Sequence, residues 1–347
     1  MAPTGRVKIT DIADKLGVSP ATVSRALSDS GLVAEPTLSR IREAAAAMNY
    51  RPNVSARNLR TRRSKAVLMV VRDVGNPFYL DVLKGVEAAA REAGYAVLMG
   101  NTENDPERET GFFDMLRDGQ ADGMVLITGQ MPQAGRYKEG LPDNLPVVVA
   151  LEMIDGTGLP HIQIDNRAAA SDAVQHLIGL GHTRIAHISG PLPEQMSELR
   201  LRGYRDAMER AGLPIPEGYE QRGDYRLVSG KRLCCALMDL PQPPTAIFAA
   251  NDEMAFGVIA AAHERGLAVP GDLSVMGFDD IYLSEAFQPP LTTISQPRAD
   301  VGRAAMTVLL DILDGRGAPD QPIILPTTLA VRGSTAAPQI LNQRRSA

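Results

Sequence analysis

The sequence predicts an α/β protein with an N-terminal helix-turn-helix headpiece and hinge helix, followed by two subdomains that are each built on a doubly wound parallel sheet. Three observations predict this architecture. The chain has 347 residues, more than one compact domain usually holds. Its first 65 residues hold 12 Lys and Arg against 5 Asp and Glu, whereas the remaining residues hold 24 against 36. From Lys65 onward, apolar runs of strand length alternate with helical stretches, a pattern typical of parallel α/β sheets.

The composition excludes several classes of protein. A hydrophobic content of 44% is ordinary for a globular chain, and no apolar run approaches the roughly 20 residues that a membrane helix needs. The N-terminus carries charge without an apolar segment behind it, so we expect no secretory signal. The two cysteines, Cys234 and Cys235, are adjacent and have no His or Cys at metal-binding spacing. We therefore expect a cytoplasmic protein with no membrane partner, no metal and no other cofactor.

Two short helices joined by a tight turn are predicted near the N-terminus. Thr10 can cap the first helix, and Gly17 suits the position that ends it. Ser19 can cap a second helix that begins at Pro20, because proline is favoured at the first helical position. A third amphipathic helix follows. This order is typical of a helix-turn-helix headpiece, which we place at residues 1–52.

The second helix carries side chains that suit DNA. Pro20 and Ala21 are small enough to allow close approach to base edges and thymine methyl groups, and Arg25 can form two hydrogen bonds to guanine. The hydroxyl groups of Thr22 and Ser24 suit backbone phosphates. With the basic charge of the segment, these residues predict double-stranded DNA as a partner. The alternative is a three-helix interaction module whose basic residues are incidental.

Residues 53–64 are expected to form a hinge helix and linker. Asn53 can cap a helix of two turns at most, which is too short to be stable alone in water. Leu59 is surrounded by arginines in this segment, as suits an apolar wedge that enters between base steps from the minor groove. The alternative is a flexible basic linker whose leucine docks on the next domain.

Two successive sets of strands and helices are predicted in residues 65–334. Continuous apolar runs, typical of strands covered on both faces, occur at residues 66–71, 95–100, 123–128, 146–151, 184–189, 245–250 and 273–278. Helical stretches lie near residues 78–93, 106–118, 197–211, 226–238 and 253–265. Residues 335–347 follow these sets, and we expect them to form a flexible tail.

Ligands of doubly wound sheets bind beyond the carboxyl ends of the strands. At those ends the sequence has carboxylates, an amide, an arginine and several aromatic residues, a set that hydrogen-bonds hydroxyl groups and stacks on a ring. We therefore expect a nucleoside or a sugar as ligand. The sequence contains no dinucleotide-binding glycine motif, P-loop, nucleophile elbow or HExxH motif, so we expect no catalytic residues and no enzyme activity.

Segments in both parts of the chain resemble the LacI family of bacterial repressors. ITDIADKLGVSPATVSRAL (9–27) followed by YRPNVSARNLR (50–60) resembles the family's headpiece and hinge helix. GNPFY (75–79), AANDEMAFG (249–257) and VRGST (331–335) resemble its effector domain, which is similar to periplasmic sugar-binding proteins.

The resemblance implies a homodimeric transcriptional repressor that binds a palindromic operator. It places Pro20, Ala21 and Arg25 at base-contacting positions, and Ala56 and Leu59 in the minor groove. It also implies that an effector binds in the cleft between the two subdomains and changes the affinity for the operator. The effector-binding residues expected on this basis are Phe78, Tyr79, Glu152, Met196, Arg200, Tyr225, Asn251 and Asp279. The alternative is a cytoplasmic sugar- or nucleoside-binding protein whose head is an oligomerisation module.

Overall fold

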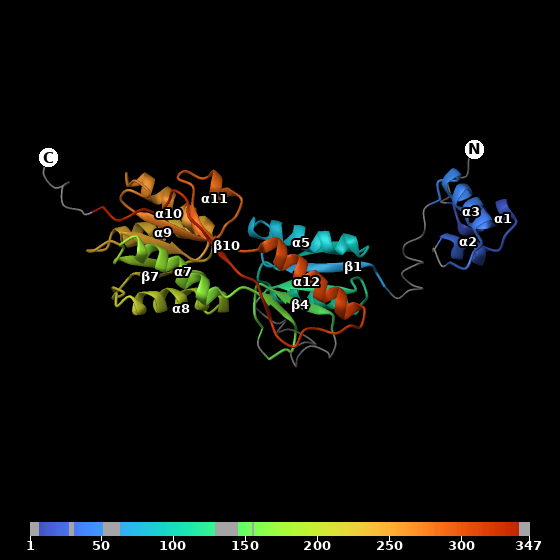
Figure 1. Cartoon of the computed structure of the whole chain (residues 1–347), viewed down its shortest axis with the longest axis horizontal. Coiled ribbons are helices and arrows are strands. Elements are labelled where there is room, and N and C mark those ends of the chain that lie inside the picture. Colours follow the sequence, from blue (N-terminus) through green and yellow to red (C-terminus); the bar gives the residue numbers. More distant parts are fainter. Residues whose placement is uncertain (1–6, 28–30, 51–62, 129–144, 155, 340–347) are drawn as a thin grey trace. The chain divides into compact units, whose positions relative to one another are not determined.

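The computed structural model describes residues 7–27, 31–50, 63–128, 145–154 and 156–339. The chain divides into two compact units, Met1–Ser64 and Lys65–Ala347, which we call the head and the body. Figure 1 labels helices of both units and several strands of the body. The predicted hinge residues Asn53, Ala56 and Leu59 lie outside the described residues.

The described part of the head consists of three helices around a small apolar core. Its buried residues include Ile12, Val23 and Ile41, one from each helix, and none of the three is accessible to solvent. The spacing of apolar residues therefore predicts the head correctly. The helices are α1 (Ile9–Leu16), α2 (Pro20–Leu27) and α3 (Glu35–Ala47).

The start of α1 differs from the sequence prediction. Thr10 is not the capping residue, because the helix already begins at Ile9. The carboxylate of Asp11 accepts a hydrogen bond of 2.8 Å from the backbone nitrogen of Lys8. This bond satisfies a donor that would otherwise lack a partner ahead of the first turn.

The turn between α1 and α2 follows the prediction. Gly17 ends α1 with a φ of 66°, a left-handed conformation that favours glycine. The hydroxyl oxygen of Ser19 accepts a hydrogen bond of 3.1 Å from the backbone nitrogen of Thr22, and so caps α2. Ala34, which precedes α3, has no side-chain oxygen to offer that helix.

The described body contains two six-stranded sheets with the same pattern of connections. Their strand orders are β11-β5-β4-β3-β1-β2 and β12-β10-β9-β8-β6-β7. Neighbouring strands are parallel except β10 and β12. We call the two halves the first and the second subdomain.

The first subdomain comprises β1 (Ala66–Val71), α5 (Phe78–Glu92), β2 (Ala96–Asn101), α6 (Pro106–Arg117), β3 (Gly123–Ile127), β4 (Val147–Ala150), β5 (His161–Gln163), α12 (Arg298–Leu313) and β11 (Ile323–Ile324). The second comprises α7 (Asn166–Gly179), β6 (Ile185–Ser189), α8 (Gln195–Arg210), β7 (Glu220–Arg222), α9 (Leu227–Met238), β8 (Ala246–Ala249), α10 (Asp252–Glu264), β9 (Ser274–Asp279), α11 (Leu283–Ala286), β10 (Thr292–Ser295) and β12 (Thr328–Ala330).

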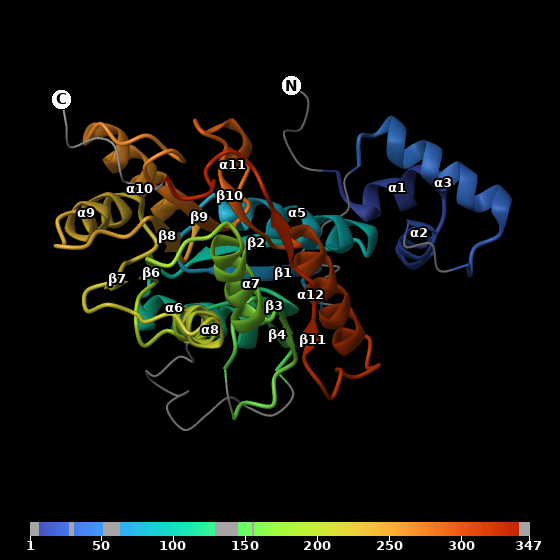
Figure 2. The same cartoon turned by 60° about the vertical axis from the view of Figure 1, so that its left-hand side comes forward.

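The chain passes between the two subdomains after β5, after β10 and after β11. As a result α12, late in the sequence, packs along α5, and Figures 1 and 2 both show the two helices side by side. Gly85 and Gly302 allow this close contact. A Cβ atom at Gly85 would lie 1.9 Å from the carbonyl oxygen of Ala299, so no larger residue fits.

Two predictions for the body need correction. The strand at residues 95–100 is not covered on both faces: β2 is an edge strand, with Leu98 39% and Met99 40% exposed. The expected tail does not begin at residue 335, because the hydroxyl of Thr335 hydrogen-bonds His176 at 3.0 Å and the Ala336 carbonyl oxygen accepts from Ser274 at 3.1 Å. No helix in the described ranges is long and apolar enough to cross a membrane.

Candidate effector pocket and recognition helix

A pocket of about 450 Å³ lies at the carboxyl ends of the strands, and residues of both subdomains line it. The polar side chains at the strand ends therefore converge, as parallel α/β sheets predict. The structure brings together all the expected effector-binding residues except Glu152. Those lining the pocket are Phe78, Tyr79, Met196, Arg200, Tyr225, Asn251 and Asp279.

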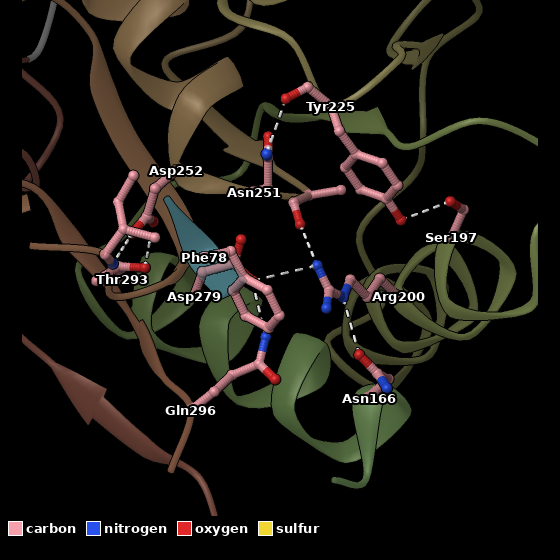
Figure 3. Close-up of polar contacts among 12 residues, drawn as sticks. Phe78, Asn166, Ser197, Arg200, Tyr225, Asn251, Asp252, Asp279, Thr293 and Gln296 are labelled. Atoms are coloured by element: carbon pink, nitrogen blue, oxygen red, sulfur yellow. Dashed lines mark hydrogen bonds and ion pairs between the residues drawn. The ribbon is translucent and has the colours of Figure 1, made fainter. Parts of the chain in front are cut away.

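Arg200 on α8 is buried and held by several groups before any ligand enters (Figure 3). Its Nε donates to Asn166 Oδ1 at 2.9 Å, and its Nη1 donates to the carbonyl oxygen of Ala250 at 2.5 Å. Nη1 also lies 3.7 Å from Asp279 Oδ1, and the guanidinium carbon lies 3.8 Å from the centre of the Phe278 ring. These contacts fix the orientation of the guanidinium group.

Asp279, at the end of β9, offers a carboxylate to the pocket. Gln296 donates from Nε2 to Asp279 Oδ1 at 2.7 Å, and Arg298 donates to the Asp279 carbonyl oxygen. Burial raises the pKa of Asp279 to about 7; Arg200 lowers it and the neighbouring Asp252 raises it further. The side-chain oxygens of Asp279 can accept a hydrogen bond from a ligand hydroxyl group, and they do so more strongly when the group is ionised.

Asn251 and Tyr225 are fixed to each other at the wall of the pocket. Asn251 Oδ1 accepts from the backbone nitrogen of Met254 at 3.0 Å, and its Nδ2 donates to the Tyr225 carbonyl oxygen at 2.9 Å. The Tyr225 hydroxyl lies 2.7 Å from Ser197 Oγ. A Cβ atom at Gly190 would lie 2.1 Å from the tyrosine ring, so glycine is required there. The ring is thereby held in place for stacking.

The first turn of α5 supplies two aromatic side chains from the opposite subdomain. The rings of Phe78 and Tyr79 meet edge to face, with centroids 5.4 Å apart and planes at 81°. The backbone nitrogen of Phe78 donates to Asn76 Oδ1 at 2.8 Å, which orients the turn that enters the helix. The pocket thus has aromatic groups and polar groups from both subdomains.

Glu152 is not among the residues that line the pocket, so its expected contact with an effector stays a prediction. Only 3% of its surface is exposed, and its Oε1 accepts from Arg72 Nη2 at 2.7 Å. A buried carboxylate needs a charged partner, which explains its orientation. Arg72 lines the pocket and also donates from Nη1 to Glu194 of the second subdomain. The sequence analysis did not select Arg72, although its place directly after β1 was an available signal.

Burial and charge act in opposite directions within this cluster of Arg72, Glu152 and Glu194. Burial by itself lowers the pKa of Arg72, but the two carboxylates outweigh it and raise that pKa. Burial also raises the pKa of Glu152, although the positive charge of Arg72 opposes this change. The half-buried ion pair of Arg72 with Glu194 links the two subdomains.

The residues predicted to contact DNA lie on the outer side of α2 in the head. Pro20, Ala21 and Arg25 are exposed, and Thr22 and Ser24 are half-buried. The fully buried residues of the helix face the apolar core instead. The described residues of the chain contain no group of His, Cys, Asp or Glu that could hold a metal ion.

Comparisons with known proteins identify the family. Residues 8–53 match the family described as bacterial regulatory proteins, lacI family, and residues 174–335 match the periplasmic binding protein-like domain. The HTH-type transcriptional repressor CytR of Escherichia coli (strain K12) is 40% identical over 329 residues, which cover 94% of this chain and 96% of CytR. The chain belongs to the lacI family of bacterial regulatory proteins.

Two further comparisons agree with this membership. The ribose operon repressor of Escherichia coli (strain K12) is 37% identical over 325 residues, which cover 93% of this lacI-family chain and 98% of that repressor. The structure of the Lac repressor dimer bound to operator and the anti-inducer ONPF has a TM-score of 0.86 and 28% identity, and covers 96% of this chain and 100% of that chain. The predicted fold class and the absence of an enzymatic role are confirmed by this family.

Proposed function

We propose that this lacI-family chain is a homodimeric transcriptional repressor whose affinity for a palindromic operator changes when a nucleoside or sugar binds in the pocket. The observation that carries the proposal is the combination of an exposed recognition helix with a pocket of pre-oriented polar and aromatic groups. The two curated relatives described above are named as repressors, one of them of the ribose operon. The Lac repressor structure supports a dimer on operator DNA.

The pocket supports a ring-shaped ligand with hydroxyl groups. Asp279 and Asn251 present oxygen and nitrogen atoms from neighbouring strand ends of the second sheet. Phe78 and Tyr225 provide ring surfaces from the two subdomains. Hydrogen bonds from sugar hydroxyl groups to the carboxylate, and stacking of a sugar or base on the rings, use both features.

Apolar side chains exposed on the first subdomain support a homodimer. Leu80 on α5 is 48% exposed, and Leu98 and Met99 on the edge strand β2 are 39% and 40% exposed. An edge strand with exposed apolar residues is typical of a surface that another chain covers. A dimer formed through this surface would carry two heads, one for each half-site of a palindromic operator.

A single strand connects the pocket to the segment that precedes the body. β1 begins at Ala66, separated by one residue from the expected hinge segment 53–64, and ends at Val71, next to the pocket residue Arg72. A ligand that changes the angle between the subdomains would move the starts of the two β1 strands in a dimer. Their separation determines whether the marginal hinge helices form together in the minor groove.

The experiment that tests the function has two stages. A thermal-shift screen against nucleosides, pentoses and hexoses identifies a ligand, because a ligand at a hundred times its Kd adds about 2.7 kcal/mol of stability. Fluorescence anisotropy with an operator duplex selected from a random pool then measures DNA affinity with and without that ligand. We expect salt-dependent binding, altered at least tenfold by the ligand. A ligand that binds without any duplex binding at low salt would favour the binding-protein alternative.

The variant Leu59→Ala tests the role proposed for the hinge. It should weaken binding to the selected operator, because the wedge in the minor groove is lost, while the thermal shift with ligand stays unchanged. Binding to a random duplex serves as the control, since it depends mainly on phosphate contacts. Unchanged operator affinity would assign Leu59 to a linker.

A further inference from the structure

The charged residues that line the pocket are predominantly acidic. Asp73, Glu194, Asp224, Glu253 and Asp279 face three arginines. We propose that the pocket accepts an uncharged, unphosphorylated nucleoside or sugar and rejects its phosphate ester. This inference rests on the proposed function and adds to it the chemical state of the ligand.

Two of the three arginines of the pocket, the half-buried Arg72 and the buried Arg200, already have partners in this chain. Arg72 donates one Nη to Glu152 and the other to Glu194, so both ends of its guanidinium group bind carboxylates. Arg200 donates to Asn166 and to a backbone carbonyl oxygen, and lies next to Asp279. A phosphate group would have to displace these partners, which would leave buried carboxylates without compensation.

Arg226 is the remaining arginine among the described lining residues. Its side chain is 75% exposed, and it lies 3.9 Å from Asp73 Oδ2. An exposed, solvated guanidinium group attracts a phosphate only weakly, because water screens the interaction. Arg226 therefore does not offset the negative charge of the acidic residues that line the pocket.

Helix N-termini often bind phosphate through free backbone N–H groups, and four helices, α5, α8, α9 and α10, begin at this pocket. At α10, Asn251 accepts from the backbone nitrogen of Met254, and Asp252 and Glu253 occupy the first turn. At α8, Glu194 directly precedes the helix. Carboxylates of this chain therefore already oppose the positive ends of α8 and α10, and Asp81 lies in the first turn of α5, whereas the first turn of α9 holds no acidic residue.

The acidic groups also affect one another. Glu152 is buried behind Arg72, and its Oε2 has no hydrogen-bond partner within the described part of the chain. Burial raises the pKa of Glu253, and the nearby Asp73 raises it further. A phosphate dianion would add two negative charges to this field. Hydroxyl and amino groups, in contrast, donate hydrogen bonds that the carboxylates can accept.

Matched pairs of ligands test the proposal by calorimetry on the full-length protein. The probes are ribose and ribose 5-phosphate, cytidine and its 5′-monophosphate, and adenosine and its 5′-monophosphate. We expect at least one neutral member to bind and its phosphate ester to bind at least a hundredfold more weakly. A phosphate ester that binds as tightly as its neutral partner, or more tightly, would overturn the inference and leave the proposed function intact. Absence of binding by these probes and by the wider screen would overturn the proposed function itself.

A charge-neutralising variant distinguishes charge from shape. Glu194→Gln keeps an acceptor for Arg72 but removes one negative charge from the lining, so the preference for the neutral ligand should fall about tenfold. Glu198→Gln is the matched control: it lies on the same helix, pairs with Arg202 and is absent from the lining, so its preference should equal that of the natural chain. A preference unchanged in Glu194→Gln would show that shape excludes the phosphate, against the proposal.

Discussion

The head and the body place their functional residues in opposite ways. In the head, the side chains proposed to contact DNA lie on the outer side of α2, whereas the packing depends on other residues such as Ile12 and Val23. In the body, Arg200 and Asp279 are both buried and both line the pocket. The DNA contacts can therefore be removed without unfolding the head, whereas changes to the pocket also weaken the body.

The largest effect is expected for Arg200→Met in the body. The change removes the hydrogen bonds to Asn166 and to the Ala250 carbonyl oxygen and leaves Asp279 without its nearest cation. Removing one partner of a buried charge pair costs about 3–5 kcal/mol of unfolding free energy. Urea denaturation followed by circular dichroism measures this loss.

Arg202→Met provides the control for that variant. Arg202 lies on the same helix and forms an exposed ion pair with Glu198 at 3.2 Å. An exposed pair contributes about 0–1 kcal/mol. Equal losses for the two variants would contradict a structural role for the pocket arginine.

The core of the second subdomain should lose stability as the pH falls. His187 stacks between Tyr204 and Phe248, at centroid distances of 5.2 and 4.8 Å, and its Nδ1 bonds the Phe248 carbonyl oxygen at 2.9 Å. Burial lowers the pKa of His187 from 6.5 to about 4. As the pH falls, His187 therefore takes up a proton in the unfolded chain before it does so in the folded chain. The free energy of unfolding keeps its full contribution from His187 above pH 6.5 and loses it as the pH falls towards 4. The difference in pKa corresponds to about 3 kcal/mol.

Chemical denaturation of the natural chain and of His187→Phe between pH 7 and pH 4 measures this contribution. The variant keeps an aromatic ring in the stack and removes the titrating group, so its stability should fall less steeply over this range. His263→Gln, at an exposed position near the end of α10, is the control and should retain the natural slope. Parallel slopes for the natural chain and His187→Phe would show that other groups dominate.

A smaller effect, confined to DNA binding, is expected for Arg25→Ala in the head. Loss of a two-bond contact to guanine costs about 1–3 kcal/mol at each half-site. Because Arg25 is exposed, the unfolding free energy should change by less than about 0.5 kcal/mol. Anisotropy with the operator measures the affinity, and the thermal shift with ligand should not change. A variant that loses ligand binding as well would contradict the separation of the two units.

How much the sequence predicts also differs between the two units. Local signals predict the head, since Gly17, Ser19 and the apolar spacing determine its helices. In the body, the strand β1 begins and ends where its apolar run predicts. Local apolar runs do not predict how the chain passes between the two subdomains. The packing of α12 on α5 depends on Gly85 and Gly302, which are more than two hundred residues apart in sequence.

The pocket shows the same limit at the level of single side chains. Strand ends predict which residues come near the ligand, and most of the expected residues do line the pocket. The strand ends do not predict the direction in which each side chain points. Glu152 turns to Arg72 because its buried charge needs a partner, and only the structure shows that this partner is close.

The smallest expected effects concern the helix caps of the head, where two opposite substitutions test the same physics. Ser19→Ala removes the acceptor for the Thr22 backbone nitrogen and should destabilise the head by about 1 kcal/mol. Ala34→Ser adds a hydroxyl group ahead of α3, where Ala34 has the extended backbone (φ −62°, ψ 141°) that a capping residue needs, and should stabilise the head by a similar amount. Hydrogen exchange of head and body amides in the intact chain measures both changes. Since the two units are separate compact regions, body amides should exchange at unchanged rates. A change in the protection of body amides in either variant would show that the stabilities of the two units are coupled.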